Sequence, residues 1–233
     1  MARNLFLLGM EHQSATRVPN KPLRKFAGYT LYDIYLRKFK AMMTSPLFSG
    51  VGIALWKGDE ELVRLTKAAG IPIIWRGNQS ANGRTNKEVF SFLKSVKPEH
   101  VLRVNACLPF QKVSTILKMA GHFLGSDIKS LEPVIRRVGW FWDGSGVHVG
   151  RHAEDTKGAQ GLRESTQGAH IFNRELMLNR GACFGYTGPK DPYLFEIDDQ
   201  FEALDIDTEE DFAIAEALFA KVGKERWDEI SKP

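Results

Sequence analysis

Apolar strand-like runs alternate with amphipathic helical segments through the first half of the chain. Leu5–Gly9 is a short apolar run of the kind that forms a buried strand, and Thr30–Met42 carries apolar residues at helical spacing. The alternation then continues strand by helix through Gly52–Leu55, Asp59–Ala69, Ile71–Trp75, Asn86–Val96, Val101–Asn105 and Val113–Leu124. Strands alternating with helices build βαβ units, so we expect an α/β fold with a mostly parallel central sheet and helices on both faces.

The second half of the chain follows a different pattern. Leu131–Trp142 and Val147–Gly150 predict two strands around the turn at 143–146, which together would form a β-hairpin arm. The polar, Gly-rich stretch Gly150–Gly168 predicts a mobile loop. Further on we expect strands at Ala169–Phe172, Leu194–Ile197 and Ala203–Asp207 and helices at Arg174–Leu178 and Thr208–Val222. Residues 1–233 therefore predict one domain with an excursion at about 131–168.

Bulk composition is ordinary for a soluble globular protein. The chain has 233 residues, 43% hydrophobic and 26% charged, with a net charge of +4. Because the charges are mixed in sign and form no long basic run, we expect neither nucleic acid nor a membrane as a partner. The two cysteines form no CxxC motif, so a reduced, cytoplasmic location is expected.

A pair of carboxylates precedes the last predicted helix. In an extended segment, Asp205 and Asp207 would project to one face while Ile206 turns inward. A hard cation such as Mg²⁺ or Mn²⁺ suits two carboxylates held together. Thr208 and Asp211 have capping-box spacing, which would fix the helix start. On spacing alone, a solvated acidic turn explains the pattern as well.

The loop after the first strand carries two cations. Arg17 and Lys21 are four residues apart on a segment stiffened by Pro19 and Pro22. A guanidinium fork and an ammonium at the end of a strand are suited to a triphosphate. The segment fits neither the GxxxxGK[ST] nor the GxGxxG pattern. A basic surface loop remains the alternative for the cations alone.

Four segments in order resemble the sugar-acid cytidylyltransferases, which are the CMP-sialic acid synthetases (acylneuraminate cytidylyltransferases) and the related CMP-Kdo synthetases. Segment 16–23, Thr-Arg-Val-Pro-Asn-Lys-Pro-Leu, is similar to their Ser-Thr/Lys-Arg-Leu/Ile-Pro-Gly-Lys signature. Segment 105–110 stands where they have Gln-Pro-Thr-Ser-Pro-Leu, and segment 168–175 resembles their Gly-Ala-Ile-Tyr-Ile-Phe-Lys-Arg-Glu strand. Segment 205–212 resembles the Asp-Ile-Asp-Thr-x-x-Asp-Phe signature of the sialic acid branch.

The resemblance implies a Rossmann-like nucleotidyltransferase fold and a Mg²⁺-dependent transfer of CMP from CTP to a 2-keto sugar acid, with release of pyrophosphate. Arg17, Lys21 and Asp207 would be catalytic, and Asp205 and Asp207 would bind the metal. The nucleotide would be bound by Met10, His12, Ser14, Thr16, Arg17, Lys21, Asn78, Ser80, Asn82 and Asn105. The acceptor's carboxylate needs a cation, and the candidate acceptor contacts are Lys157, Arg163 and Gln160, with Arg151 a further cation. A homodimer formed through the arm, with its aromatic cluster Trp140–Trp142, is also implied.

The chain departs from the family pattern in its first loop. The usual Ala-Arg-x-Gly-Ser is Glu-His-Gln-Ser-Ala at 11–15, so that His12 stands in place of an arginine. Two alternatives therefore stay open: the same chemistry on another acceptor, such as a different sugar or a phosphonate, or a nucleotide-binding protein that has lost activity. We expect no metal role for His148, His152 and His170 and no nucleophilic role for Cys107.

Overall fold

A twisted central sheet organises the protein. The computed structural model describes residues 4–13, 17–150, 155, 157 and 161–232. Within these residues eight strands form the sheet, in the order β10-β7-β11-β6-β1-β4-β5 with β12 added beside β7. The strands are β1 (Leu5–Met10), β4 (Gly50–Trp56), β5 (Ile73–Arg76), β6 (His100–Val104), β7 (Leu131–Arg137), β10 (Leu162–Ser165), β11 (Ala169–Asn173) and β12 (Tyr193–Glu196).

The strand directions confirm the expected parallel sheet. β1 pairs in parallel with β4 and β6, and β4 pairs in parallel with β5. β11 lies antiparallel between β6 and β7, and β10 is antiparallel to β7. Two short hairpins stand outside the sheet: β2 (Lys25–Phe26) with β3 (Tyr29–Thr30), and β8 (Phe141–Trp142) with β9 (His148–Val149). The βαβ half predicted from the alternation therefore carries the parallel strands.

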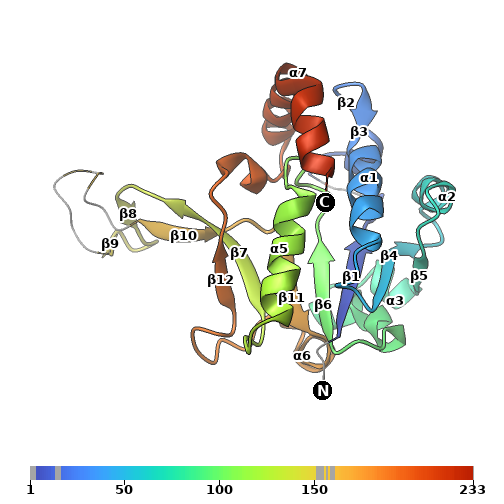
Figure 1. Ribbon diagram of the computed structural model, residues 1–233, viewed down its shortest axis with the longest axis horizontal. Helices are drawn as coiled ribbons and strands as arrows, with labels where there is room; N and C mark the ends of the chain where they lie inside the picture. The colour runs from blue at the N-terminus through green and yellow to red at the C-terminus, as the bar shows by residue number, and fades with distance from the viewer. Residues whose placement is uncertain (1–3, 14–16, 151–154, 156, 158–160, 233) are drawn as a thin grey trace.

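Helices cover both faces of the sheet, as Figure 1 shows for the front face. α1 (Leu31–Met43), α2 (Glu60–Ala68) and α5 (Val113–Leu124) bury their apolar sides against one face. α4 (Asn86–Val89), α6 (Arg174–Arg180) and the 3₁₀-helix Ser91–Ser95 cover the other face. The remaining elements are α3 (Asn78–Ala81), α7 (Glu209–Ser231) and 3₁₀-helices at Lys21–Leu23 and Gln200–Ala203.

A third apolar cluster joins the two ends of the chain. α7 packs on the β2–β3 hairpin and on the start of α1, and the ring of Phe26 contacts those of Phe212 and Phe219. Buried Val18 and Ile206 belong to the same cluster. The first loop and the segment before α7 are thus held side by side by hydrophobic packing, although about 190 residues separate them along the chain.

Local sequence sets the helix starts as expected. Thr30 caps α1 and Thr208 caps α7, and each pairs with an aspartate three residues on in a capping box. Each box satisfies backbone N–H groups that the first helical turn leaves free. The capping box predicted at Thr208 and Asp211 is therefore confirmed.

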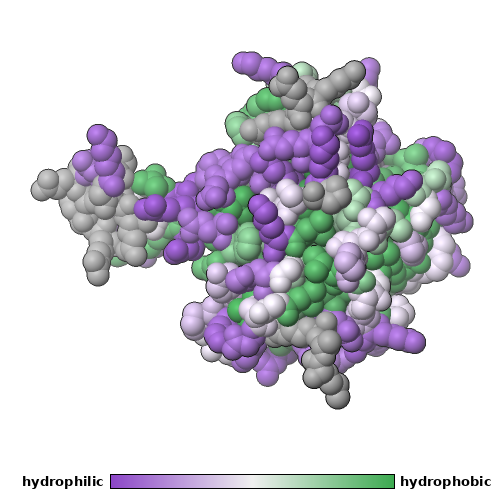
Figure 2. Space-filling model, in the orientation of Figure 1, coloured by the Kyte–Doolittle hydropathy of each residue, from purple (hydrophilic) through white to green (hydrophobic). Residues whose placement is uncertain are grey.

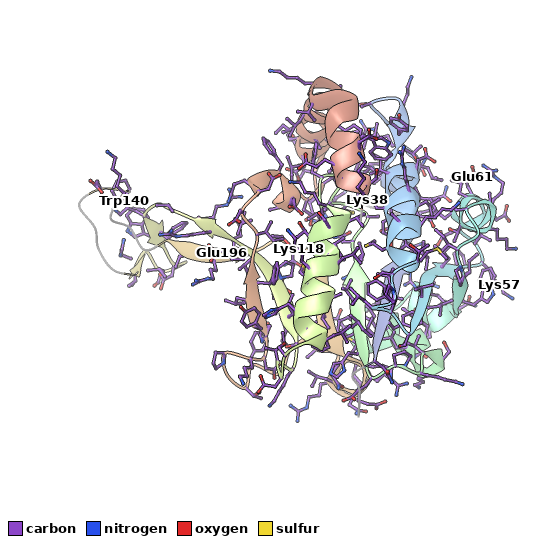
Figure 3. The ribbon with its side chains drawn as sticks, viewed as in Figure 1. Lys38, Lys57, Glu61, Lys118, Trp140 and Glu196 are labelled. Carbon is purple, nitrogen blue, oxygen red and sulfur yellow. The ribbon has the colours of Figure 1, made fainter. Side chains whose placement is uncertain are left out.

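The arm is built from β8 and β9 at the far end of β7 and β10. It stands clear of the body in Figures 1 and 2. Trp142 is 62% exposed, and Trp140 lies on the arm away from the sheet in Figure 3. Val138 and Val147 are also exposed. These apolar side chains are exposed on the arm rather than packed in the core of the described residues.

Four predicted elements differ in kind or in course, and α7 in addition runs on to Ser231, beyond its predicted end at Val222. The helix expected at Asn86–Val96 is divided into α4 and a 3₁₀-helix, because Phe90, at the break, turns into the apolar cluster beneath the sheet. The strand expected at Leu131–Trp142 stops at Arg137, where the chain leaves the sheet for the arm. Part of the predicted loop Gly150–Gly168 is β10, which pairs with β7.

The fourth difference is at Ala203–Asp207, which is no strand. Gln200–Ala203 forms a 3₁₀-helix, and residues 204–207 lie outside the sheet. The N–H of Ile206 instead donates to the carbonyl of Cys107, and its side chain is fully buried.

Among the described residues, no helix combines the length and apolar character that crossing a bilayer needs.

Gly9 allows β1 to pass close under α1. A Cβ at this position would lie 2.1 Å from the hydroxyl of buried Tyr35 and 2.8 Å from Ile53. We therefore expect Gly9→Ala to lower the free energy of unfolding by about 1–3 kcal/mol, since the core has no room for another methyl group. Urea unfolding of the purified variant measures the loss.

Gly121→Ala is the matched control. Gly121 lies inside α5, and a Cβ there would meet nothing within 4 Å. This change should be neutral or stabilising by about 0.5–1 kcal/mol, because alanine favours the helix. Equal stability of the two variants would contradict the close approach of β1 and α1.

Candidate active site

The parallel strands end together at one edge of the sheet. β1 ends at Met10, β4 at Trp56, β5 at Arg76 and β6 at Val104. In α/β sheets ligands bind at this carboxyl edge. The loops that follow these four strands, together with the segment before α7, form the candidate site.

Two cations meet a carboxylate at this edge. Arg17 Nη2 lies 2.7 Å from Asp207 Oδ1, and Lys21 Nζ lies 4.0 Å from the same oxygen. Lys21 also donates to the Ile206 carbonyl oxygen at 2.6 Å. The Arg17 side chain is 68% exposed and that of Lys21 only 13%. Lys21 is therefore an anchored charge, whereas Arg17 is open to a ligand.

Asp205 stands beside Asp207, as the sequence predicted, although no strand places them. Burial raises the pKa of the Asp205 carboxyl to about 6, and the negative charge of Asp207 adds to the rise. Among the described residues, Asp205 Oδ1 is buried and accepts no hydrogen bond. A buried carboxylate oxygen in this state is costly unless a cation reaches it.

Glu11 is a site residue that the sequence did not single out. Burial raises the pKa of its carboxyl to about 7, against the opposing pull of Arg103 and Lys21. The N–H of Ala106, after β6, donates to this carboxylate. Glu11 therefore links the ends of β1 and β6 beneath the cations. Its place directly after a buried strand was the only signal in the sequence.

His12 is paired with a second residue that sequence reasoning missed. Its Nδ1 lies 2.9 Å from both carboxylate oxygens of Asp59, which is buried at the start of α2. Asp59 also accepts the Gln13 N–H at 3.1 Å. The ring of Trp56 meets the His12 ring edge-on at 6.0 Å between centroids. The His12 side chain is therefore held in one position.

The predicted contacts at Asn78, Ser80 and Asn82 lie on α3 and just after it. Asn78 is exposed and accepts from Trp56 Nε1 at 3.1 Å, and Asn82 is exposed as well. Ser80 is buried, and its hydroxyl accepts from Arg76 and donates to the Val89 carbonyl. Arg76 in turn donates to the carbonyl of Glu11 at 3.4 Å. Ser80 thus supports the loop from below rather than facing outward.

Asn105 holds its own loop in place. Its amide nitrogen donates to the Gln167 carbonyl at 3.2 Å, and its amide oxygen accepts the Cys107 N–H at 3.0 Å. Met10 is the last residue of β1 and half-buried. Ser14 and Thr16 lie outside the described residues, as do Gln160, Arg151 and His152.

A cavity of about 490 Å³ opens beside Gln167. Its polar lining includes Arg163 and Ser165 of β10, Glu132 of β7 and His170 of β11. Apolar side chains complete the wall: Val134, Phe184, Tyr186, Pro192 and Leu194. Of the predicted acceptor contacts, Arg163 lines this cavity and lies 3.4 Å from Glu196, whereas Lys157 is exposed and is not among the lining residues.

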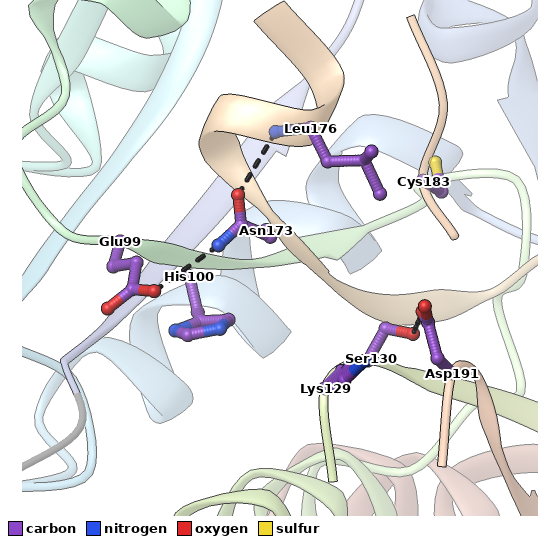
Figure 4. Close-up of a pocket in the computed structure, with 8 residues that line it drawn as sticks. All are labelled: Glu99, His100, Lys129, Ser130, Asn173, Leu176, Cys183 and Asp191. Atoms are coloured by element: carbon purple, nitrogen blue, oxygen red, sulfur yellow. Dashed lines mark hydrogen bonds between the residues drawn. The ribbon is translucent and has the colours of Figure 1, made fainter. Parts of the chain in front are cut away.

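A second cavity, of about 370 Å³, lies near the opposite edge of the sheet and is shown in Figure 4. There Asn173 donates to Glu99 and accepts from the Leu176 N–H, while Ser130 donates to Asp191 at 2.7 Å. None of the predicted site residues lines it.

A model of the cytidylyltransferase family matches residues 12–230. The chain belongs to the cytidylyltransferase family. It is therefore a nucleotidyltransferase, as the motif order at its two ends indicated.

Solved structures share the fold of this cytidylyltransferase at low sequence identity. CMP:2-keto-3-deoxy-manno-octonic acid synthetase complexed with CTP aligns with a TM-score of 0.67 at 11% identity, over 94% of this chain and 100% of that one. A 4-diphosphocytidyl-2C-methyl-D-erythritol synthase from Anaerococcus prevotii aligns with a TM-score of 0.62 at 14% identity, over 93% and 96% of the two chains. None of the curated proteins matches the sequence.

The structure also shows the surroundings of residues for which the sequence predicts neither a metal role nor a nucleophilic role. Within the part of the chain that the structure describes, no group of three or more His, Cys, Asp or Glu side chains is arranged to hold a metal ion. Burial raises the pKa of the Cys107 thiol to about 12, which disfavours the thiolate that a nucleophile needs. His148 contacts the Trp142 ring on the arm.

His170 and Glu132 in the large cavity titrate in opposite senses. Burial lowers the pKa of His170 from 6.5 to about 3 and raises that of Glu132 from 4.5 to about 7. Between pH 6.5 and about pH 3, His170 takes up a proton only in the unfolded chain, so acidification lowers the stability of the fold. Glu132 takes up its proton first in the folded chain, so acidification through the same range adds stability.

His170→Gln should therefore remove a group whose protonation in the unfolded chain lowers stability in acid. Relative to the unaltered protein, its free energy of unfolding should rise on going from about pH 6.5 to about pH 5, by up to about 1.4 kcal/mol per pH unit. Glu132→Gln should shift in the opposite direction. Urea unfolding at the two pH values measures both, and parallel shifts in the two variants would contradict the assignment.

Proposed function

We propose that this protein transfers CMP from CTP to a 2-keto sugar acid of the nonulosonic type and releases pyrophosphate, with Mg²⁺ as cofactor. The observation that carries the proposal is the meeting of Arg17, Lys21, Asp205 and Asp207 at the carboxyl edge of the sheet. Cations for a triphosphate and carboxylates for a divalent metal are the parts that phosphoryl and nucleotidyl transfer need.

The cations have distinct tasks in the reaction. Lys21, fixed by the Ile206 carbonyl, supplies a positioned charge for the phosphates. Arg17 is exposed and bound to Asp207, so a triphosphate competes with Asp207 for its guanidinium. Both charges would stabilise the negative charge that develops on the departing pyrophosphate. Catalysis of this step is mainly orientation and charge neutralisation.

The two aspartates fit a magnesium ion. Asp205 has a buried oxygen that accepts no hydrogen bond from the described residues, and Asp207 offers a second carboxylate next to it. Mg²⁺ is commonly held by one or two carboxylates together with substrate phosphates. When bound, the ion would supply Lewis-acid activation of the sugar hydroxyl. Asp207 would leave Arg17 for this role.

The cavity beside Gln167 is our candidate for the acceptor site. Gln167 accepts from Asn105, which follows β6 at the carboxyl edge, so the cavity adjoins the nucleotide side of the site. Arg163 supplies a cation for a carboxylate, while Ser165 and Glu132 supply hydrogen bonds for hydroxyl groups. The apolar wall suits the carbon skeleton of a sugar acid.

The arm is our candidate for contact with a second copy of the chain. Its exposed apolar side chains, Val138, Trp140, Trp142 and Val147, lie together on a projection that the body does not cover. Apolar patches of this kind mark protein contacts. The proposal is therefore a homodimer in which each arm packs on its partner.

Pyrophosphate release tests the function. With CTP, Mg²⁺ and a panel of 2-keto sugar acids, we expect release with at least one acceptor, and a loss of kcat/KM of about 10²-fold or more in Asp207→Asn and Lys21→Ala. A chelator should abolish release. Turnover only with an acceptor that lacks a carboxylate would favour another sugar or a phosphonate instead.

The matched controls are Asp127→Asn and Lys190→Ala. These residues form an exposed ion pair at 2.5 Å, beyond the end of α5 and away from the cluster. Both controls should keep full turnover. Full turnover in Asp207→Asn and Lys21→Ala as well would contradict the proposed site, and CTP binding without turnover on any acceptor would contradict an enzymatic role.

A further inference from the structure

Asp59 occupies a helix-capping position but serves another group. It is the N-cap residue of α2, yet within the described residues its side chain accepts no hydrogen bond from the first turn of that helix. An aspartate at this position usually stabilises its helix by accepting such a bond. Here both carboxylate oxygens face His12, and one also accepts the Gln13 N–H. The carboxylate is thus directed across the site, from the end of β4 to the end of β1.

Contacts on two sides fix the His12 ring. A carboxylate only accepts hydrogen bonds, so His12 Nδ1 carries the proton that lies between it and Asp59. The edge contact with Trp56 limits rotation on another side. The His12 side chain keeps 27% of its surface exposed. The second ring nitrogen, Nε2, is therefore the polar group that His12 can offer to a ligand.

Arg76 is a charged neighbour of this pair, but its hydrogen bonds go elsewhere. Arg76 lies close enough to Asp59 and Glu11 for both charges to act on its guanidinium. Its donors are directed to Ser80 and to the Glu11 carbonyl rather than to the carboxylate of Asp59. Lys21 and Arg103 act on Glu11 from the other side. Among the described residues, the hydrogen bonds to the Asp59 carboxylate therefore come from His12 and from the Gln13 N–H.

We propose that Asp59 is a positioning residue that turns His12 Nε2 toward the phosphates of the bound nucleotide, so that the imidazole donates a hydrogen bond to a phosphate oxygen at the end of β1. Nδ1–H is donated to Asp59, which leaves Nε2 to meet a phosphate oxygen. When both ring nitrogens carry protons, Nε2–H donates to that oxygen and Asp59 balances the charge of the ring. This inference rests on the proposed function, because it requires a nucleotide in the site.

A purely structural role is the competing explanation. Through the Gln13 N–H, Asp59 also anchors the beginning of the segment that leads to Arg17. If anchoring were its only task, removing the carboxylate charge would harm the site whatever residue stood at position 12. If Asp59 acts through the imidazole, a side chain with a permanent charge at position 12 would make Asp59 dispensable.

A double-mutant cycle separates these two explanations. The dissociation constants of CTP and of CMP are measured by isothermal titration calorimetry for the unaltered protein, D59N, H12R and the H12R/D59N double variant. Far-UV circular dichroism and urea unfolding confirm that each variant is folded. H12Q, which keeps a polar side chain without the charge, serves as a second probe of the imidazole.

We expect D59N and H12Q each to weaken CTP binding about tenfold, as for the loss of one charge-assisted hydrogen bond, and CMP binding less. In the H12R background, D59N should weaken CTP binding by no more than about twofold, because arginine stays charged without Asp59. Equal losses in both backgrounds, or no loss in D59N, would overturn the inference alone. An unaltered protein that binds no CTP would overturn the proposed function with it.

Discussion

The ammonium group of Lys21 joins the two ends of the chain at the carboxyl edge of the parallel strands. It donates to the Ile206 carbonyl and lies 4.0 Å from Asp207, so the loop after β1 and the segment before α7 share one point of contact. Ile206 holds the segment before α7 in place, because its side chain is buried and its N–H donates to the Cys107 carbonyl. Together with the apolar cluster of α7, this contact sets cations from one end of the chain opposite carboxylates from the other.

Much of the fold could be predicted because its signals are local. The parallel strands appear in the sequence as short apolar runs, and α5 begins and ends at the residues that helical spacing predicts, Val113 and Leu124. The capping box of Thr208 and Asp211 is likewise local and was found. Four motifs in order predicted a sugar-acid cytidylyltransferase. The match to residues 12–230 bears out the cytidylyltransferase family, while the sialic acid branch stays a prediction.

What the sequence could not reveal depends on contacts between distant segments. Asp59 has the appearance of a helix cap, and only the folded chain shows its carboxylate turned toward His12, 47 residues away. Glu11 gains its raised pKa from burial beside β6, which no local pattern encodes. The pairing of β10 with β7 was hidden in a polar stretch, because its short strand has few apolar residues. The roles of Arg17, Lys21, Asp205 and Asp207 in binding remain predictions.

The packing of α7 on the first loop has a consequence for biosynthesis. Phe212 and Ile206 supply the apolar surface on which Val18 and Phe26 rest, so these contacts span nearly the whole length of the chain. A chain still emerging from the ribosome can assemble β1, β4, β5 and β6 with their helices, yet it has nothing to hold Arg17 and Lys21 in place. The edge that carries these cations is therefore completed last, when the C-terminal helix docks, and long-range closure of this kind is slow compared with local folding.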